Sequence, residues 1–364
     1  MSIRVLKKNR WLSGLALVVA LLLVACGSND TTGTQPTAGP AAVRVNGFGV
    51  AANHVHSLLA LPPHVLILAT HYGIFRSVDD GASWQEVAGG PNQLMQGLMA
   101  YSLGYSSLDS QRLYVLTQPA VNQYAGTPGL YTSADQGRTW ELSIATASLT
   151  SHTIFLAAPG NDTSGEVYIY LPDLGPLGLR VSVDAGKHFS STGMLPFGRI
   201  NGLLAIPGMM GHLLAYGSDG MAYSADGGIH WQSIKGITGG IFDVATAGPS
   251  TSHLVIYASG DAGIFVSPDG GRTFTLVDSQ DSFNSLSVSA AKSQILYGKS
   301  GTGVYRSING GQMWSLLPHI KGNLAVLAVD PNNAMQVYLS LSYPTAIYRL
   351  DGKSKEWMSL TPQA

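Results

Sequence analysis

The chain has 364 residues, of which 45% are hydrophobic and 11% are charged, with 44 glycines and 1 cysteine. Its 20 Lys and Arg residues nearly balance its 21 Asp and Glu residues, and the lack of a basic excess argues against nucleic-acid binding. A single cysteine cannot form a disulfide within the chain, so the fold must depend on its apolar core.

The first 25 residues have the pattern of a secretory signal: four basic residues precede a short apolar run over residues 11–25. That run is too short and wrongly flanked for a transmembrane helix. It ends in Leu-Val-Ala-Cys-Gly at residues 23–27, which resembles the bacterial lipobox. The resemblance implies that Cys26 is acylated and becomes the first residue of the mature chain. We therefore predict a signal peptide over residues 1–25 and an extracytoplasmic lipoprotein held at the membrane by the lipid on Cys26.

Residues 26–44 follow as the lipidated cysteine and a linker rich in Gly, Thr and Pro, without hydrophobic periodicity. This composition predicts a flexible spacer. Removal of residues 1–25 takes four basic residues and no acidic ones, which leaves 16 Lys and Arg against 21 Asp and Glu, a net charge of −5. The mature chain therefore has no polybasic stretch that would add membrane affinity.

From residue 45 onward one motif, Ser-x-Asp-x-Gly-x-x-Trp/Phe, recurs six times, beginning at Ser77, Ser133, Ser182, Ser224, Ser267 and Ser307. Successive copies begin 56, 49, 42, 43 and 40 residues apart. A period of this length indicates structural units that bury their faces only against their neighbours. A weaker seventh copy ends in Trp357.

The motif describes a turn. Asp and Ser side chains accept hydrogen bonds from nearby backbone N–H groups, Gly supplies a positive φ, and the aromatic residue packs a large ring. The third position of the six copies is occupied by Asp79, Asp135, Asp184, Asp226, Asp269 and Asn309. Because Asn309 can make the same turn but cannot act as a base or nucleophile, we interpret all six residues as structural.

The six motifs resemble the Asp-box (BNR) repeats of sialidase-like β-propellers. The resemblance implies an all-β, seven-bladed β-propeller over residues 45–364, built of four-stranded blades with each box between the third and fourth strands. Strand patterns between the boxes agree, for example residues 201–206, 212–216, 220–223 and 231–234 in the fourth unit. Six blades with an N-terminal extension is the alternative. The same repeat is found in sialidases, other glycoside hydrolases, sorting receptors and photosystem II assembly factors, so it assigns no function.

In propellers of this family the boxes lie on one face and ligands usually meet the opposite, unboxed face. Loops that enter first strands, or join second strands to third strands, should lie on that face. They carry the polar binding-face candidates His54, His56, His71, Asn201 and Asn284, and the acidic candidates Asp219, Asp243 and Asp261.

Three of these candidates are histidines of the first unit. His54 and His56 should share one face of a strand by the period-2 rule, and His71 ends the neighbouring strand. Three convergent imidazoles would suit Zn, Cu or Ni; alternatively, the rings only bind loop backbones. This first unit also resembles the opening blade of a group of bacterial proteins labelled glycosylhydrolases.

A glycoside hydrolase remains open as an alternative function. The chain has four Glu residues, none placed to face the channel, and the Phe/Tyr-Arg-Ile-Pro motif of sialidases is missing, Phe-Gly-Arg-Ile-Asn at residues 197–201 being its nearest approach. Sialidase activity is therefore not expected. Other retaining or inverting hydrolases need only two carboxylates about 5–10 Å apart, which Asp219, Asp243 and Asp261 could supply as catalytic residues.

The sequence favours a monomeric binding or assembly module that meets a protein or glycan partner on its unboxed face. The alternatives are the glycoside hydrolase that uses inner-face aspartates, and a metal-binding module that uses the histidines of the first unit. We expect no organic cofactor and no nucleic-acid partner.

Overall fold

The computed structural model describes residues 53–361, apart from gaps at 107, 150–152, 155, 161–164, 248–253, 302, 343–344 and 355. The predicted signal peptide, Cys26 and the linker lie outside the described residues. The described part consists of β-strands and two short 3-10 helices. Neither helix approaches the length and apolar character that a membrane crossing requires.

The strands form seven sheets of four strands each, which we number as blades in chain order. Blade 1 comprises β1 (Val55–Leu61), β2 (Val65–Thr70), β3 (Gly73–Ser77) and β4 (Gln85–Ala88). Blade 2 comprises β5 (Leu98–Ser106), β6 (Asp109–Pro119), β7 (Gly129–Ser133) and β8 (Glu141–Ala145). Blade 3 comprises β9 (Leu156–Pro159), β10 (Val167–Tyr170), β11 (Leu179–Ser182) and β12 (Ser190–Ser191).

Blade 4 comprises β13 (Gly202–Ala205), β14 (Leu213–Gly217), β15 (Gly220–Ser224) and β16 (Gln232–Ser233). Blade 5 comprises β17 (Ile241–Ala247), β18 (Val255–Gly260), β19 (Gly263–Ser267) and β20 (Thr275–Asp278). Blade 6 comprises β21 (Ser285–Val288), β22 (Leu296–Ser300), β23 (Gly303–Ser307) and β24 (Ser315–Leu316). Blade 7 comprises β25 (Leu324–Val329), β26 (Val337–Leu341), β27 (Ala346–Leu350) and β28 (Met358–Ser359).

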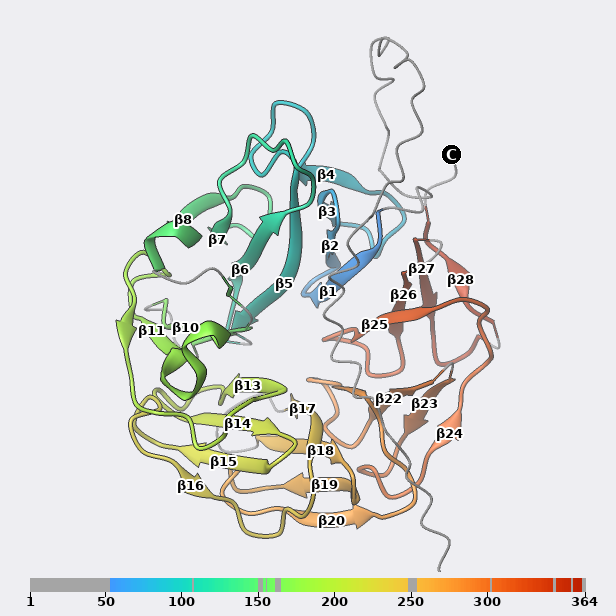
Figure 1. The fold of residues 1–364 in the computed structure, drawn as a ribbon. Helices are drawn as coiled ribbons and strands as arrows, with labels where there is room; N and C mark the ends of the chain where they lie inside the picture. The colour runs from blue at the N-terminus through green and yellow to red at the C-terminus, as the bar shows by residue number, and fades with distance from the viewer. Residues whose placement is uncertain are drawn as a thin grey trace, which may run out of the picture. The chain divides into compact units, whose positions relative to one another are not determined.

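Each blade is an antiparallel meander in which consecutive strands pair, so the first strand lies at one edge and the fourth at the other. Figure 1 shows the blades arranged in a ring, with first strands around the centre and fourth strands at the rim. The first strands of successive blades contact one another, and β1 of blade 1 contacts β25 of blade 7. The predicted seven-bladed propeller is therefore confirmed, and the six-bladed alternative is wrong.

The apolar core is divided among the interfaces between blades. Seven clusters of buried side chains occur, one at each blade-to-blade interface, and the cluster between blades 1 and 2 includes Ile67, Leu113 and Tyr131. The second strand of a blade is buried on both faces; in β2 every residue is buried. Each blade thus depends on its neighbours for stability, as expected for a repeat architecture.

The box turns join third strands to fourth strands, and each box serine is the last residue of a third strand. In blade 1 the Ser77 hydroxyl donates to Asp79 (2.7 Å) and accepts from the N–H of Gly81 (2.8 Å). The Asp79 carboxylate accepts from the N–H of Ser83 (2.8 Å) and from its hydroxyl (2.6 Å). Gly81 has a φ of 87° and a Cβ there would meet Leu360 at 2.7 Å, so the position requires glycine.

The sixth turn is made by Asn309 in the same way. Its side-chain oxygen accepts from Ser307 (2.9 Å) and from the N–H of Met313 (3.0 Å). Of the box aromatics, Trp84 and Phe274 are buried, whereas Trp140, Phe189, Trp231 and Trp314 are half-buried. The aromatic position was expected to pack a large ring, and of the four box tryptophans only Trp84 is buried.

The ring closes between blade 7 and blade 1 through side chains. The indole N–H of Trp84 donates to the carbonyl of Leu360 (3.2 Å), and the hydroxyl of Tyr338 donates to the carboxylate of Asp80 (3.0 Å). The Thr345 hydroxyl donates to the carbonyl of Asn53. All four strands of blade 7 come from one consecutive stretch of the chain, so closure relies on packing and these contacts rather than on a shared sheet.

Candidate functional site

The two faces of the propeller differ in their connections. In blades 1, 4 and 5 the second and third strands are joined by two residues, 71–72, 218–219 and 261–262. In blades 2 and 3 the same connection is much longer. It covers residues 120–128 in blade 2 and residues 171–178 in blade 3, and the latter contain the 3-10 helix η2 (Pro172–Gly178). The unboxed face is therefore raised over two neighbouring blades.

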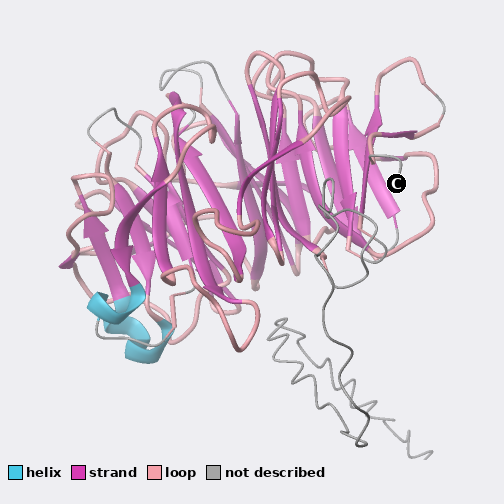
Figure 2. Cartoon of the chain, turned by 90° about the horizontal axis from the view of Figure 1, so that it is seen from above, coloured by secondary structure: helices cyan, strands magenta, loops and turns pink. Residues whose placement is uncertain are grey.

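Five connections on this face are linked by hydrogen bonds, and we call their described residues the loop ridge: 89–97, 120–128, 146–149 with 153–154, 171–178 and 192–201. The helix η1 (Thr146–Leu149) belongs to the third segment. Figure 2 shows the helical turns together on one side of the propeller, beyond the strand ends.

Backbone groups connect each ridge segment to the next. The carbonyl of Gln96 accepts from the N–H groups of Ala125 (3.1 Å) and Gly126 (2.9 Å). The N–H of Thr146 donates to the carbonyl of Pro128 (2.9 Å). The N–H of Thr153 donates to the carboxylate of Asp173 (3.2 Å), and the N–H of Leu195 donates to the carbonyl of Pro176 (2.8 Å).

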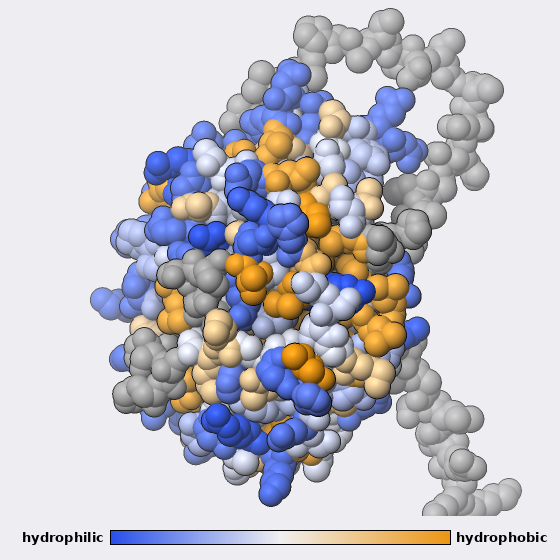
Figure 3. All heavy atoms as spheres, turned by 90° about the vertical axis from the view of Figure 1, so that its left-hand side faces the viewer, coloured by the Kyte–Doolittle hydropathy of each residue, from blue (hydrophilic) through white to orange (hydrophobic). Residues whose placement is uncertain are grey.

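The ridge is apolar and nearly uncharged. Its described residues include two charged side chains, those of Asp173 and Arg199. Within the described part of the unboxed connections, every exposed large apolar side chain lies on the ridge: Leu94, Val121, Tyr124, Leu177 and Met194. Leu177 and Met194 are 63% and 62% exposed. Figure 3 looks at the rim on the side of β8 and β11, where apolar and hydrophilic residues are interspersed. Exposed apolar side chains that gather on one surface mark an interaction site.

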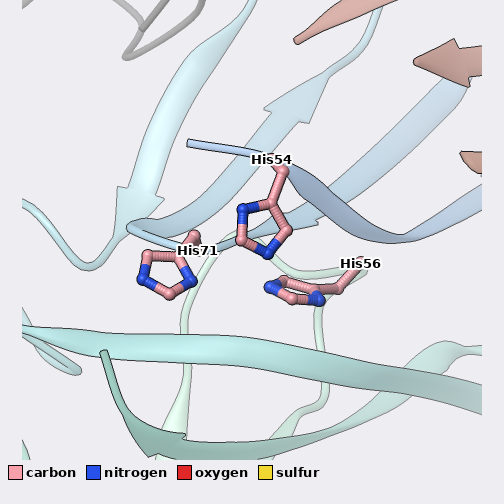
Figure 4. Close-up of side chains that lie close together, drawn as sticks. All are labelled: His54, His56 and His71. Carbon is pink, nitrogen blue, oxygen red and sulfur yellow. The ribbon is translucent and has the colours of Figure 1, made fainter. Parts of the chain in front are cut away.

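Beside the ridge, the three histidines of blade 1 converge (Figure 4). The ring centroids of His54 and His56 are 4.5 Å apart, those of His54 and His71 are 4.8 Å apart, and those of His56 and His71 are 6.0 Å apart. One ring nitrogen from each residue can be chosen so that all three nitrogens lie within 4.8 Å of one another. All three side chains are half-buried.

Local backbone structure holds the three rings together. The pairing of β1 with β2 shifts register between Val55 and Ser57, so His56 is the extra residue of a β-bulge, a feature that re-aims a side chain. His71 lies in the two-residue β2–β3 turn, and its N–H donates to the carbonyl of His54 (3.0 Å). The N–H of Tyr72 donates to the side-chain oxygen of the buried Asn53 (3.0 Å), which fixes the turn.

Burial governs the protonation of these rings. It lowers the pKa of His56 to about 3, with His54 and His71 as smaller electrostatic causes. Burial also lowers the pKa of His71, as does His54, while a hydrogen bond to the Ala120 carbonyl acts in the opposite direction. Two buried ring nitrogens, Nε2 of His56 and Nδ1 of His71, have no hydrogen-bond partner in the described residues.

The carboxylate of Asp243, a predicted catalytic residue on β17 of blade 5, forms hydrogen bonds that link blades 4, 5 and 6. Its carboxylate accepts from the N–H of Leu286 on β21 (2.8 Å), from its neighbour Val244 (2.9 Å) and from the Tyr216 hydroxyl on β14 (3.4 Å). Burial raises the pKa of Asp243 to about 6, although these hydrogen bonds lower it. Burial lowers the pKa of Lys299, and Asp243 partly restores it. Most of the hydrogen-bonding capacity of Asp243 is thus used between blades.

The other predicted residues lie apart in single turns. Asp261 is exposed and its carboxylate accepts from the N–H of Gly240 (2.8 Å). Asp219 is exposed, with the Ser218 hydroxyl at 3.4 Å. The Asn201 amide donates to the carbonyl of Ile241 (2.8 Å), and Asn284 is exposed. In the described residues no hydrogen bond joins any two of Asp219, Asp243 and Asp261.

A cavity of about 510 Å³ occupies the central channel. It is lined mainly by the apolar later halves of first strands, for example Leu59, Ala205 and Val288, so it lies toward the boxed side. Asp243 lines it, but Asp219, Asp261 and the three histidines do not. The cavity therefore does not unite the predicted catalytic aspartates.

Solved structures show what the fold is similar to. The chain is similar to a GH74 enzyme from Niastella koreensis, with 16% identity and a TM-score of 0.64 over 84% of this chain and 53% of that one. It is similar to a GH74 xyloglucanase from Xanthomonas campestris, with 16% identity and a TM-score of 0.59 over 85% and 54%. It is also similar to YCF48 bound to D1 peptide, with 14% identity and a TM-score of 0.56 over 82% and 94%.

These likenesses show the propeller fold, which occurs both in enzymes and in a peptide-bound protein. The chain spans about half the length of the two GH74 structures and nearly the full length of the YCF48 structure. No protein-family model matches the sequence, and neither does any curated protein.

The loop ridge was missed by reasoning from the sequence. The box spacings gave a signal, because the two longest intervals, 56 and 49 residues, enclose blades 2 and 3. Residues 89–97 and 120–128 contain no charged residue yet include Leu94, Val121 and Tyr124. Long, uncharged connections with apolar residues on a repeat scaffold are candidates for binding, since connections can vary without disturbing the core.

Proposed function

We propose that this protein is a lipid-anchored, extracytoplasmic propeller that binds a protein partner through the loop ridge on its unboxed face. The segment it binds would be apolar or uncharged, because the ridge offers two charged side chains among its described residues. A strongly charged partner would leave its own charges without counter-charges on such a surface.

The observation that carries this proposal is the distribution of exposed apolar side chains. On the unboxed connections they gather on one hydrogen-bonded ridge, as described above, rather than being scattered singly around the ring. Tyr and Leu side chains of this kind supply large contact areas at the centre of protein interfaces. The likeness in fold and length to a peptide-bound propeller supports the same interpretation.

The lipobox-like sequence at residues 23–27 supports the anchoring part of the proposal. A diacylated cysteine provides stable membrane attachment where a single chain gives only reversible binding. The Gly-, Thr- and Pro-rich linker sequence after Cys26 would let the propeller meet partners near the bilayer surface.

Selection from a random twelve-residue peptide library on the immobilised full chain tests the proposal. We expect the selected peptides to be rich in apolar residues, and their affinity to fall about tenfold or more in a Tyr124→Ser/Leu177→Ser variant, since a buried anchor contributes more than about 1.4 kcal/mol. Hydrogen exchange on the bound chain should show protection within residues 120–128 and 171–178.

The matched control replaces two exposed apolar side chains on the boxed face, in a Val183→Ser/Ile308→Ser variant. This control should bind the selected peptides as the unmodified chain does. Loss of binding in the control alone would move the site to the boxed face, and an equal loss in both variants would argue for nonspecific adhesion.

A glycoside hydrolase function is the second candidate, and one observation favours it. Asp243 lines the channel cavity and has a pKa raised to about 6, a value that suits a general acid. Such an acid needs a second carboxylate about 5–10 Å away. Release of reducing sugar from xyloglucan, abolished by Asp243→Asn and also by either Asp219→Asn or Asp261→Asn, would support this candidate and identify the pair of carboxylates.

A further inference from the structure

The three converging histidines have the spacing of a metal site. Three imidazoles bound to one tetrahedral ion at about 2.0–2.1 Å place their ligand nitrogens about 3.4 Å apart and their ring centroids about 5 Å apart. The observed centroid separations of 4.5, 4.8 and 6.0 Å bracket that value. The nitrogens lie within 4.8 Å of one another, so small rotations of the rings would complete the geometry.

Two nitrogens of the cluster lack any other partner. Nε2 of His56 and Nδ1 of His71 are both inaccessible to solvent and make no hydrogen bond to described residues. A buried polar atom without a partner destabilises a protein, so such atoms usually bind water or an ion. We propose that His54, His56 and His71 bind one divalent transition-metal ion, with Zn²⁺ or Cu²⁺ as the candidates, and leave one coordination position open.

The backbone around His71 prepares that ring as a ligand. The N–H of His71 donates to the carbonyl of His54 (3.0 Å), so the two residues are held side by side. Figure 4 shows one ring nitrogen of His71 on the side that faces His54 and His56. Nδ1 of His71 is buried and makes no hydrogen bond to described residues, so its lone pair is available to an ion.

The scaffold of the cluster is rigid enough to hold a site. The His71 turn is fixed at both ends, by the bond from Tyr72 to Asn53 and by the Thr70 hydroxyl, which donates to the carbonyl of Gly73 (3.0 Å). Gly73 has a φ of 139°, and a Cβ there would meet the carbonyl oxygen of Ala88 at 2.4 Å. Sites on fixed strand ends keep their ligands close to the productive geometry.

The donor set selects the class of metal. Within the described residues the cluster contains imidazole ligands and no carboxylate or thiolate. Imidazole suits Zn²⁺, Cu²⁺ and Ni²⁺, whereas Mg²⁺ and Ca²⁺ prefer oxygen ligands. Three histidines with one open position is also the ligand set of a site where water or another small ligand completes the coordination.

The proposed metal site is separate from the proposed docking function, because none of the three ligands belongs to the loop ridge. The two ideas can fail independently, since metal affinity is measured without any peptide and peptide affinity without any metal.

Equilibrium dialysis of the untagged full chain against Zn²⁺ alone, and separately against Cu²⁺ alone, tests the proposal. We expect one tightly bound ion per chain and a raised melting temperature in its presence. His56→Gln and His71→Gln should each weaken binding by about 100-fold or more, because even loss of an outer partner of a ligand weakens binding by about 10–100-fold. Gln keeps a polar side chain at each position and so limits damage to the fold.

The matched control removes two histidines outside the cluster, in a His188→Ala/His230→Ala variant. These rings are 88% and 83% exposed and each contacts the aspartate of its own box, which makes them the main places for adventitious binding. The control should keep the tight ion. Tight binding that survives in His56→Gln, or that is lost in the control, would overturn the proposal, as would the absence of tight binding of both metals.

A measurement on the unmodified chain removes the dependence on variants that fold poorly. The electron paramagnetic resonance spectrum of the bound Cu²⁺ should show splitting from three nitrogen nuclei. Splitting from fewer than two nitrogens would contradict a site built from His54, His56 and His71.

Discussion

The boxed and unboxed faces of this propeller are built from the same strands but follow opposite rules. On the boxed face, six turns repeat one set of hydrogen bonds from a serine hydroxyl and an Asp or Asn side chain. On the unboxed face, connections range from the two residues 71–72 to the ten residues 192–201. A turn whose every polar atom is used cannot change without loss of stability, so variation, and with it specific binding, is left to the opposite ends of the strands.

The histidine cluster and the loop ridge both follow this rule. His56 lies on a β-bulge and His71 in a two-residue turn, and both positions are on the unboxed side. The boxed face also carries histidines, His188 and His230, but each is an exposed partner of its own box aspartate. The same residue type is therefore structural on one face and available for binding on the other.

The largest effect should come from the boxed face at the ring closure. Trp84 is 8% exposed and packs in the cluster shared by blades 7 and 1. Trp84→Ala should lower the free energy of unfolding by about 3–5 kcal/mol, the loss usual for a buried aromatic residue. Urea unfolding of the full chain measures it. Trp314→Ala is the control and should lose less, because that ring is half-buried; equal losses would contradict the packing described for the closure.

A smaller effect on the free energy of unfolding is expected at Asp243, and its dependence on pH should be opposite to that of the box aspartates. Burial raises its folded-state pKa to about 6, above the unfolded value of about 3.9. The folded state then binds more protons between these values, so Asp243 makes folding more favourable as the pH falls from 7 to 4, by about 2 kcal/mol. As the pH falls over this range, the free energy of unfolding of the unmodified chain should therefore rise relative to that of the Asp243→Asn variant.

The box aspartates predict the reverse trend. Hydrogen bonds to Ser83 and Ser77 hold the pKa of Asp79 below its usual value against a raising effect of burial. Such a group stabilises the fold above the unfolded pKa and loses that contribution as the pH falls through the folded pKa. A pH profile of Asp79→Asn that paralleled that of Asp243→Asn would remove the distinction between the box carboxylates and the buried carboxylate of the channel.

A still smaller effect is expected for single box substitutions that keep an acceptor. Asp226→Asn should lower the free energy of unfolding by less than about 1 kcal/mol, since Asn309 makes the same bonds in blade 6. Asp226→Ala should lose about 1–2 kcal/mol, because the N–H of His230 and the hydroxyl of Ser224 lose their acceptor. Chemical denaturation of both variants measures the difference. Equal losses would mean that the charge, and not the acceptor, matters.

No effect on folding is expected for Cys26→Ala, although the location of the protein should change. We propose that this variant leaves the melting temperature as it is and releases the protein from the membrane fraction, because lipid on Cys26 is the proposed attachment. Fractionation with lipid labelling measures it. Unchanged labelling and membrane retention would contradict the lipobox interpretation.

Much of the fold could be read from the sequence, because the repeat constrains it many times over. The strands predicted in the fourth unit at residues 201–206, 212–216, 220–223 and 231–234 match β13, β14, β15 and β16 to within one residue at each end. The period-2 rule also brought His54 and His56 together with His71. The period-2 rule could not predict the bulge at His56, because an extra residue in one strand does not change the hydrophobic pattern in a recognisable way.

The loop ridge could not be predicted in the same way. Its segments are held by backbone groups such as the carbonyl of Gln96 and the N–H of Leu195, and backbone hydrogen bonds between distant loops have no residue signature. Likewise, nothing in the sequence around Asp243 shows that the N–H of Leu286, 43 residues away, occupies its carboxylate. Solitary long-range contacts of this kind come only with the structure.

The ring closes between blades 7 and 1 through side-chain contacts and not through a sheet shared by the first and last strands. Every blade is a complete sheet, and the seam holds by the packing of one side-chain cluster with contacts such as those of Trp84 and Tyr338. Because no strand is shared across this seam, the ring could open between blades 7 and 1 while both sheets stay whole. Such opening would expose the seam side chains while the strand amides of both blades stay protected from hydrogen exchange.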